Sequence, residues 1–125
     1  MSVTEAQQAL LEDLFASIDS QDAERFVTFL TPDASFRFGS APAAHGTKAI
    51  RAAVGGFFET IRGLRHEVLR SMAGDAVLVC EGNVTYTRID GSEIALPFVD
   101  VFEMSDDGLI ADYKIYMDIA PLYAA

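Results

Sequence analysis

The sequence predicts an α+β fold, in which three N-terminal helices pack on one face of a curved, mainly antiparallel sheet. Apolar residues recur at helical spacing up to about Leu64 and at every second position beyond it. The second half also holds two hairpin turn sequences, Asp90-Gly91 and Asp106-Asp107-Gly108, in which glycine tolerates positive φ. Long strands joined by tight turns pair as a meander, so helices and strands are segregated along the chain.

The first half is expected to hold the three helices. Thr4 and Gln7 have capping-box spacing, and the apolar stripe within residues 10–18 continues the first helix. A short second helix is expected over residues 23–30. Thr47 can then cap a third helix, which carries a further apolar stripe.

Strands are expected to begin after the second helix. Pro32 ends that helix because proline cannot donate a hydrogen bond inside a helix. A short strand over residues 34–38 and a loop over residues 39–46 then lead to the third helix. Four further strands with alternating patterns are expected at residues 65–72, 76–89, 93–104 and 109–119.

Side-chain alternation assigns the strand residues to two faces of the sheet. The face toward the helices is expected to hold Leu78, Cys80, Gly82, Val84, Tyr86, Leu96, Phe98, Asp100, Phe102, Met104, Ala111, Tyr113, Ile115, Met117 and Ile119. The opposite face carries the partly apolar set Val79, Val99, Val101, Ile110 and Tyr116. An exposed patch of this kind commonly marks an interface, so we expect a homodimer formed through the outer sheet face.

Asp100 interrupts an otherwise apolar row. A buried carboxylate without a partner costs several kcal/mol or takes up a proton. One interpretation is structural, with Asp100 bonded to a Tyr hydroxyl, to His66 or to a backbone donor. The other interpretation places Asp100 in a ligand cavity, with a raised pKa, as a proton donor or base.

Composition and charge exclude several classes of protein. The chain has 125 residues, half of them apolar, which is enough for a single domain over residues 1–125 with a real core. Its net charge of −10 repels phosphate and anionic lipid, so neither nucleic acid nor a membrane is an expected partner. A single cysteine, together with no signal-like start and no long apolar run, favours a cytoplasmic location.

Other chemistry in the sequence is sparse. Two widely spaced histidines and one cysteine do not make a zinc site, and phosphate-loop and dinucleotide motifs are absent. We therefore expect no metal and no cofactor. Cys80 is expected to be a small buried core residue, and His45 a loop residue. His66 lies on a predicted strand and is a candidate partner for Asp100.

The order of the predicted elements resembles the nuclear transport factor 2-like superfamily. Residues 14–46, LFASIDSQDAERFVTFLTPDASFRFGSAPAAHG, are similar to the family's two opening helices, first strand entry and glycine before the third helix. Residues 99–118, VDVFEMSDDGLIADYKIYMD, are similar to its last hairpin, and the tail at residues 120–122 resembles SnoaL-like members in particular. The resemblance implies a cone, in which a strongly curved sheet wraps against the helices and leaves an open hydrophobic pocket.

The resemblance also implies functional residues, which match this chain unevenly. Ketosteroid isomerase has a protonated Asp on its penultimate strand, which Asp100 matches. Its carboxylate base and its Tyr donor fall on Phe38 and Leu14. Limonene epoxide hydrolase has an Arg and an Asp on the strand that here holds Gly82 and Val84. Neither residue is present at those two positions, so the hydrolase's catalytic set is absent. SnoaL-like cyclases use an acid in an apolar pocket, a role similar to that open to Asp100.

Three functions remain open from the sequence. The first is a proton-transfer enzyme of isomerase or cyclase type that acts on a small hydrophobic carbonyl compound, with Asp100 as acid or base and Tyr113, Tyr86 or His66 as supporting donors. The second is a non-catalytic binding module for a hydrophobic small molecule, and the third is a dimeric accessory domain. The pocket is expected to be lined by Leu14, Phe36, Phe38, Val54, Phe58, Cys80, Val84, Tyr86, Phe98, Phe102, Ile115 and Met117.

Overall fold

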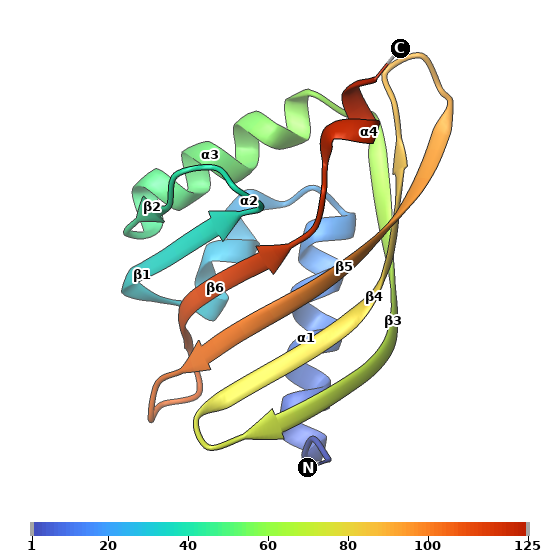
Figure 1. Cartoon of the computed structure of the whole chain (residues 1–125). Coiled ribbons are helices and arrows are strands. Elements are labelled where there is room, and N and C mark those ends of the chain that lie inside the picture. The colour runs from blue at the N-terminus through green and yellow to red at the C-terminus, as the bar shows by residue number, and fades with distance from the viewer. Residues whose placement is uncertain (1, 125) are drawn as a thin grey trace.

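The computed structural model describes residues 2–124, in which four α-helices and a 3₁₀ turn accompany one six-stranded sheet. The elements are α1 (Glu5–Asp19), α2 (Ala23–Phe26), the 3₁₀ turn η1 (Val27–Phe29), β1 (Leu30–Phe38), β2 (Ala44–His45), α3 (Thr47–Glu59), β3 (Gly63–Gly74), β4 (Val77–Thr87), β5 (Glu93–Met104), β6 (Ile110–Tyr116) and α4 (Ala120–Tyr123). The predicted α+β class is confirmed. The strand order is β2-β1-β6-β5-β4-β3, and β1 pairs with β6 in parallel while the other pairs are antiparallel (Figure 1).

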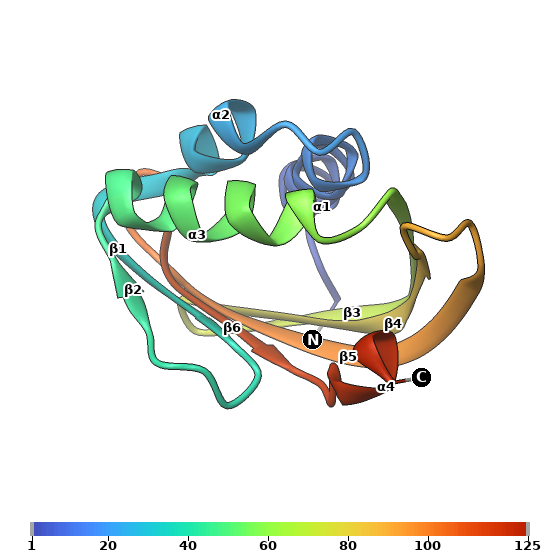
Figure 2. The ribbon, with the colours of Figure 1, turned by 90° about the horizontal axis from the view of Figure 1, so that it is seen from above.

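The helices α1, α2 and α3 lie on one side of the sheet, which curves toward them at both edges (Figure 2). The sheet is curled but not closed, because β2 and β3 are its two ends and do not pair with each other. Alternation along β4 is as predicted, with every second residue from Leu78 to Tyr86 buried beneath the helices. Within residues 2–124, no helix is long and apolar enough to cross a membrane.

The start of α1 follows the predicted capping box. The Thr4 hydroxyl accepts from the Gln7 backbone N–H at 3.1 Å, and the Gln7 side chain accepts from the Thr4 N–H at 2.8 Å. The start of α3 differs from the expectation, because Gly46 is the N-cap and Thr47 is the first helical residue. Gly46 adopts a φ of 84°, a conformation that glycine reaches without a steric penalty.

Two of the predicted boundaries around β1 were wrong. The strand begins at Leu30 instead of residue 34, so Pro32 lies inside it. Pro32 is tolerated because β2 pairs only with Ser35 and Phe36, and because the register between β1 and β6 shifts in the stretch between Leu30 and Ser35. The expected loop before α3 also contains the short strand β2.

The C-terminal segment also departs from the expectation. The last strand ends at Tyr116, and α4 follows it beside the end of α3 (Figure 1). The guanidinium of Arg88 fixes α4, since it donates to the carbonyl oxygens of Pro121 and Leu122, each at 2.9 Å. The hydroxyls of Thr60 and Tyr123 are also 2.9 Å apart.

Ile110 was assigned to the outer face of the sheet, and the structure corrects this. Its side chain is fully buried, whereas Tyr116 at the other end of β6 is 57% exposed. The pairing with β5 shifts between Glu103 and Met104, because Ala111 has no cross-strand partner there. This extra residue is a β-bulge, which reverses the alternation for everything before it on the strand.

A second bulge bends β3 where it crosses β4. The register shifts between Val68 and Arg70, so Leu69 is the extra residue. At this point β3 lies so close to Gly82 that a Cβ on that residue would be 1.9 Å from the backbone oxygen of Glu67. Because bulges bend strands and increase their twist, glycine at this position permits the sheet to curve.

We predict that Gly82→Ala lowers the free energy of unfolding by about 1–3 kcal/mol, since the backbone of β3 must move. Gly56→Ala is the matched control, because Gly56 is exposed on α3 and nothing outside its own stretch of helix lies within 4 Å of its Cβ position. The free energy of unfolding of the control should rise by up to about 1 kcal/mol, because alanine has a higher helix propensity than glycine. Urea denaturation of both variants measures the difference, and an unchanged midpoint for Gly82→Ala would contradict this account of the bend.

The outer face of the sheet keeps Val79, Val99, Val101 and Tyr116 from the predicted set, and we predict that two copies pair through it. Sedimentation at micromolar concentration should then give twice the 13.6 kDa mass of the chain. Val101→Glu should shift the mass to one chain, because it places a charge in the middle of this face. Ile89→Glu, at an exposed hairpin residue, is the control and should leave the mass unchanged. A single-chain mass for the unmodified protein would exclude the dimer.

Candidate active site

An apolar cavity of about 310 Å³ lies between the helices and the concave face of the sheet. Its walls come from the helices α1, α2 and α3 and from all six strands, and the C-terminal segment borders it. The lining residues are Ile18, Phe26, Phe36, Phe38, Ala41, Pro42, Ala44, Ala53, Val54, Phe57, Phe58, Leu64, His66, Val84, Tyr86, Phe98, Asp100, Tyr113, Ile115, Met117, Ile119 and Tyr123. All three predicted catalytic residues, Asp100, His66 and Tyr113, are among them.

The structure places most of the predicted pocket residues on the cavity wall. They are Phe36, Phe38, Val54, Phe58, Val84, Tyr86, Phe98, Ile115 and Met117. Leu14, Cys80 and Phe102 are instead fully buried in the core and do not line the cavity. Alternation assigns a residue to a face of the sheet, but it does not say where along the strand the cavity ends. Contact of these residues with a ligand stays a prediction.

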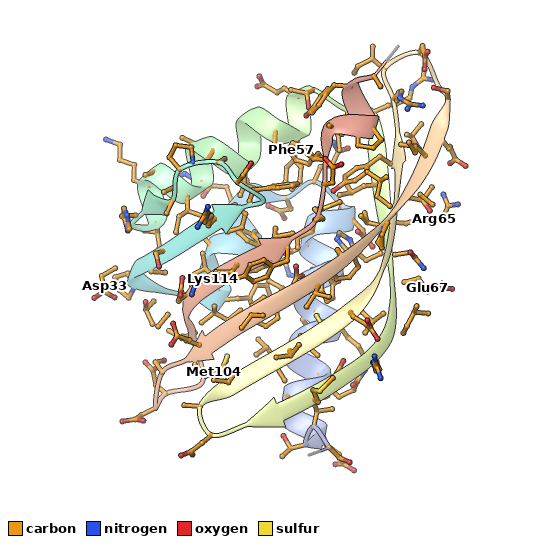
Figure 3. All side chains as sticks on the ribbon, viewed as in Figure 1. Asp33, Phe57, Arg65, Glu67, Met104 and Lys114 are labelled. Atoms are coloured by element: carbon orange, nitrogen blue, oxygen red, sulfur yellow. The ribbon has the colours of Figure 1, made fainter. Side chains whose placement is uncertain are left out.

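Several lining residues were not predicted. Phe57 projects from α3 toward the sheet, whereas Arg65 and Glu67 point outward from β3 (Figure 3). Phe57 and Ile18 belong to apolar helical stripes, which gave a signal that could have identified them. No sequence pattern indicates Tyr123 as a lining residue, because it follows the last predicted strand and reaches the cavity only through the turn of α4.

Asp100 is buried among aromatic and aliphatic side chains on β5. The residue is 2% exposed, and its Oδ1 atom has no hydrogen-bond partner among the described residues. Burial raises the pKa of its carboxyl group well above 3.8, and a hydrogen-bond contribution from the Tyr113 hydroxyl opposes this shift only in part. A neutral carboxyl group in such a place has a proton to donate and no protein acceptor for it at Oδ1.

Tyr113 is held beside Asp100 by an aromatic cluster. Its ring centroid lies 4.5 Å from that of Phe102, 5.1 Å from that of Phe36 and 5.5 Å from that of Phe26. Burial, followed by the charge of Asp100, raises the pKa of the Tyr113 hydroxyl well above 10. The hydroxyl is therefore a neutral donor whose position is set by packing.

His66 does not pair with Asp100, which had been one of the expected arrangements. Its Nδ1 atom lies 2.6 Å from Oδ1 of Asp19, and its backbone N–H donates to Oδ2 of the same carboxylate at 3.0 Å. Asp19 is the last residue of α1, and no sequence pattern indicates its contact with a residue 47 positions away. His66 nonetheless lines the cavity, so it remains a candidate site residue.

The described residues contain no group of three or more His, Cys, Asp or Glu side chains arranged to hold a metal ion. The buried polar groups of the cavity wall are few. Asp100, Tyr113 and His66 can donate or accept protons and hydrogen bonds within an apolar space.

A family model for the SnoaL-like domain matches residues 11–113 of the chain. Among solved structures, a nuclear transport factor 2-like protein of unknown function from Burkholderia pseudomallei is 16% identical, with 95% of each chain covered and a TM-score of 0.84. These matches confirm the predicted resemblance to the nuclear transport factor 2-like superfamily. No curated protein sequence matches the chain.

Two further structures share the fold. TerC, co-crystallised with polyporic acid, is 17% identical, with 93% of this chain and 94% of TerC covered and a TM-score of 0.80. A protein from Shewanella denitrificans, predicted to be a SnoaL-like polyketide cyclase, is 14% identical, with 96% of each chain covered and a TM-score of 0.80. At these identities the likeness shows the fold alone.

The titration of Asp100 predicts how stability depends on pH. Its pKa is raised by folding, so folding takes up a proton at pH values between the unfolded and folded pKa values. The stabilisation is fully present below about pH 3.8 and is lost as pH rises through the folded pKa. Between these two pKa values, the free energy of unfolding of the natural protein should therefore fall, relative to that of Asp100→Asn, by up to about 1.4 kcal/mol per pH unit.

Urea denaturation of both proteins from pH 3 to pH 8 measures this difference. Asp90→Asn is the control of opposite sign, because hydrogen bonds from Ser92 lower the pKa of Asp90. The stability difference between the natural protein and Asp90→Asn should grow as pH rises toward about 3.8 and stay level above it. Parallel curves for the natural protein and Asp100→Asn would show that Asp100 does not titrate as described.

Proposed function

The chain belongs to the SnoaL-like domain family, and we propose that it binds a small hydrophobic carbonyl compound and catalyses proton transfer on it. Asp100 is the acid of this reaction, and Tyr113 is its supporting donor. The observation that carries the proposal is the unpartnered Oδ1 of a fully buried Asp100 in the wall of an apolar cavity. A carbonyl oxygen from a ligand supplies the acceptor that this carboxyl group lacks among the described residues.

The apolar surroundings suit this chemistry. When a C–H bond next to a carbonyl breaks, the proton passes to a water molecule from solvent, and the electron pair moves onto the carbonyl oxygen. A neutral acid that already faces the oxygen stabilises the developing charge, and does so more strongly in a cavity that excludes water. The same proton-transfer step begins both double-bond isomerisation and carbon–carbon ring closure, so the proposal includes both reaction types.

The alternative is that the same cavity binds such a molecule without reacting with it. One feature favours this alternative. By resemblance, the carboxylate base of ketosteroid isomerase falls on Phe38, a residue that cannot accept a proton. An accessory domain that pairs through the outer sheet face is also compatible with the fold. Turnover of a simple substrate separates the enzyme from both alternatives.

We predict that the protein accelerates the isomerisation of cyclohex-3-enone to its conjugated isomer, followed by ultraviolet absorbance, or the exchange of its α-hydrogens in D₂O, followed by NMR. Asp100→Asn keeps the side-chain volume but removes the acid, so the rate should fall by about 100-fold or more. Binding of the conjugated ketone, measured by calorimetry, should change far less. Tyr113→Phe should lower the rate by a smaller factor.

Asp75→Asn is the control, because Asp75 lies in the exposed turn between β3 and β4. It should leave both the rate and the binding unchanged. Equal rates for the natural protein and Asp100→Asn would remove Asp100 from the reaction. Binding without any acceleration would support the non-catalytic alternative.

A further inference from the structure

We propose that His66 is a second recognition point of the same cavity and that the ligand carries a hydroxyl group, which donates a hydrogen bond to Nε2 of His66. This inference rests on the proposed function, because it concerns the ligand of that cavity. It narrows the ligand class to hydrophobic molecules with a carbonyl group at one position and a hydroxyl group at another.

The contact with Asp19 determines which nitrogen of His66 can accept. An ionised carboxylate only accepts hydrogen bonds, so Nδ1 of His66, 2.6 Å from Oδ1 of Asp19, must carry the hydrogen. In the neutral imidazole the other nitrogen, Nε2, then has the free lone pair. The hydrogen bonds of His66 leave Nε2 with no protein partner among the described residues.

His66 lies between the apolar cavity and a second, polar groove, and this position indicates where Nε2 points. Asp19 lines a polar groove between α1 and β3, and His66 is the one described residue shared by that groove and the apolar cavity. The Nδ1 edge of the ring faces Asp19 and the groove. Because the two ring nitrogens of imidazole point in nearly opposite directions, the Nε2 edge is the one that His66 presents to the cavity.

The ring is held firmly in this orientation. Its centroid lies 4.7 Å from that of Phe15 and 5.3 Å from that of Phe98, and its side chain is only 10% exposed. Asp19 also accepts from the backbone N–H of His66, so the carboxylate is fixed relative to β3. An acceptor that is fixed before binding loses little conformational freedom when a ligand arrives.

The sheet register sets the spacing between the two recognition points. His66 is opposite Val84 and Asp100 is opposite Cys80, so the two residues are four positions apart along β4 and on either side of it. Four strand residues extend about 13 Å, although the side chains converge on the concave face. The carbonyl and hydroxyl groups of the ligand must therefore be separated by at least one ring.

An alternative role for the Asp19–His66 contact is structural, because it connects the end of α1 to β3. A purely structural contact requires Nδ1 of His66 but makes no use of Nε2. The two roles therefore differ in one measurable respect, which is whether a ligand hydroxyl strengthens binding in a way that depends on His66.

Matched ketones with and without a hydroxyl group test the proposal by calorimetry. The one-ring pair is 4′-hydroxyacetophenone and acetophenone, and the two-ring pair is 6-hydroxy-2-acetonaphthone and 2-acetonaphthone. In at least one pair the hydroxyl compound should bind about three- to tenfold more tightly, as expected for one net hydrogen bond. His66→Phe should abolish this gain and leave the affinity of the unhydroxylated ketone nearly unchanged.

His45→Phe is the matched control, since His45 lies exposed on β2 away from the cavity wall, and it should keep the gain. If His66→Phe does not fold, Asp19→Asn serves in its place. An amide can donate or accept, so Nε2 is no longer kept free, and the hydroxyl-dependent gain should fall selectively.

Nitrogen-15 NMR at pH 8 tests the tautomer without any ligand, and the chain has only two histidines to assign. We expect a protonated Nδ1 and an unprotonated Nε2 in His66. A protonated Nε2, in either the other tautomer or the imidazolium, would overturn the proposal, as would an equal affinity within both ketone pairs. Absence of binding by all four ketones would instead contradict the proposed function, so the two failures are distinguishable.

Discussion

The close approach of β3 to β4 at Gly82 is the constraint on which the cavity depends. A side chain at this position would collide with the backbone of β3, so glycine and the bulge at Leu69 together let the sheet bend toward the helices. A flat sheet would place its apolar face directly against α1 and α3. The bend instead leaves a space that aromatic side chains line but do not fill.

The polar groups of the cavity wall differ in how fully the protein satisfies them. Nδ1 of His66 is paired with Asp19 in the neighbouring groove, whereas Oδ1 of Asp100 and Nε2 of His66 are left without a partner in residues 2–124. Unpaired buried polar atoms oppose folding, and a ligand that pairs with them recovers part of that cost on binding. Under the proposed function, an apolar surface would therefore supply affinity, and two fixed polar atoms would supply selectivity.

Periodicity predicted the fold class and the buried row on β4 because both depend on local pattern alone. It failed for Ile110, because the bulge at Ala111 reverses the alternation and leaves no mark in the residue types. Asp100 could be identified as a carboxylate in an apolar row. The Asp19–His66 contact could not, because it depends on how the end of α1 meets β3 in space. Alternation likewise says nothing of where a cavity ends, so it places Cys80 and Phe102 on the correct face without showing that they lie in the core beyond the cavity wall.

The parallel pairing of β1 with β6 has a consequence for the order of folding. Ser35 and Asp112, joined by a side-chain hydrogen bond across this pair, are 77 positions apart, whereas the hairpins of β3 to β6 close through short turns. Closing a long loop costs more conformational entropy and delays the contacts that reward it. The meander can thus assemble from local contacts, while β1 and the two phenylalanines that it contributes to the cavity dock late. The cavity is then complete only when the most distant segments of the chain have met.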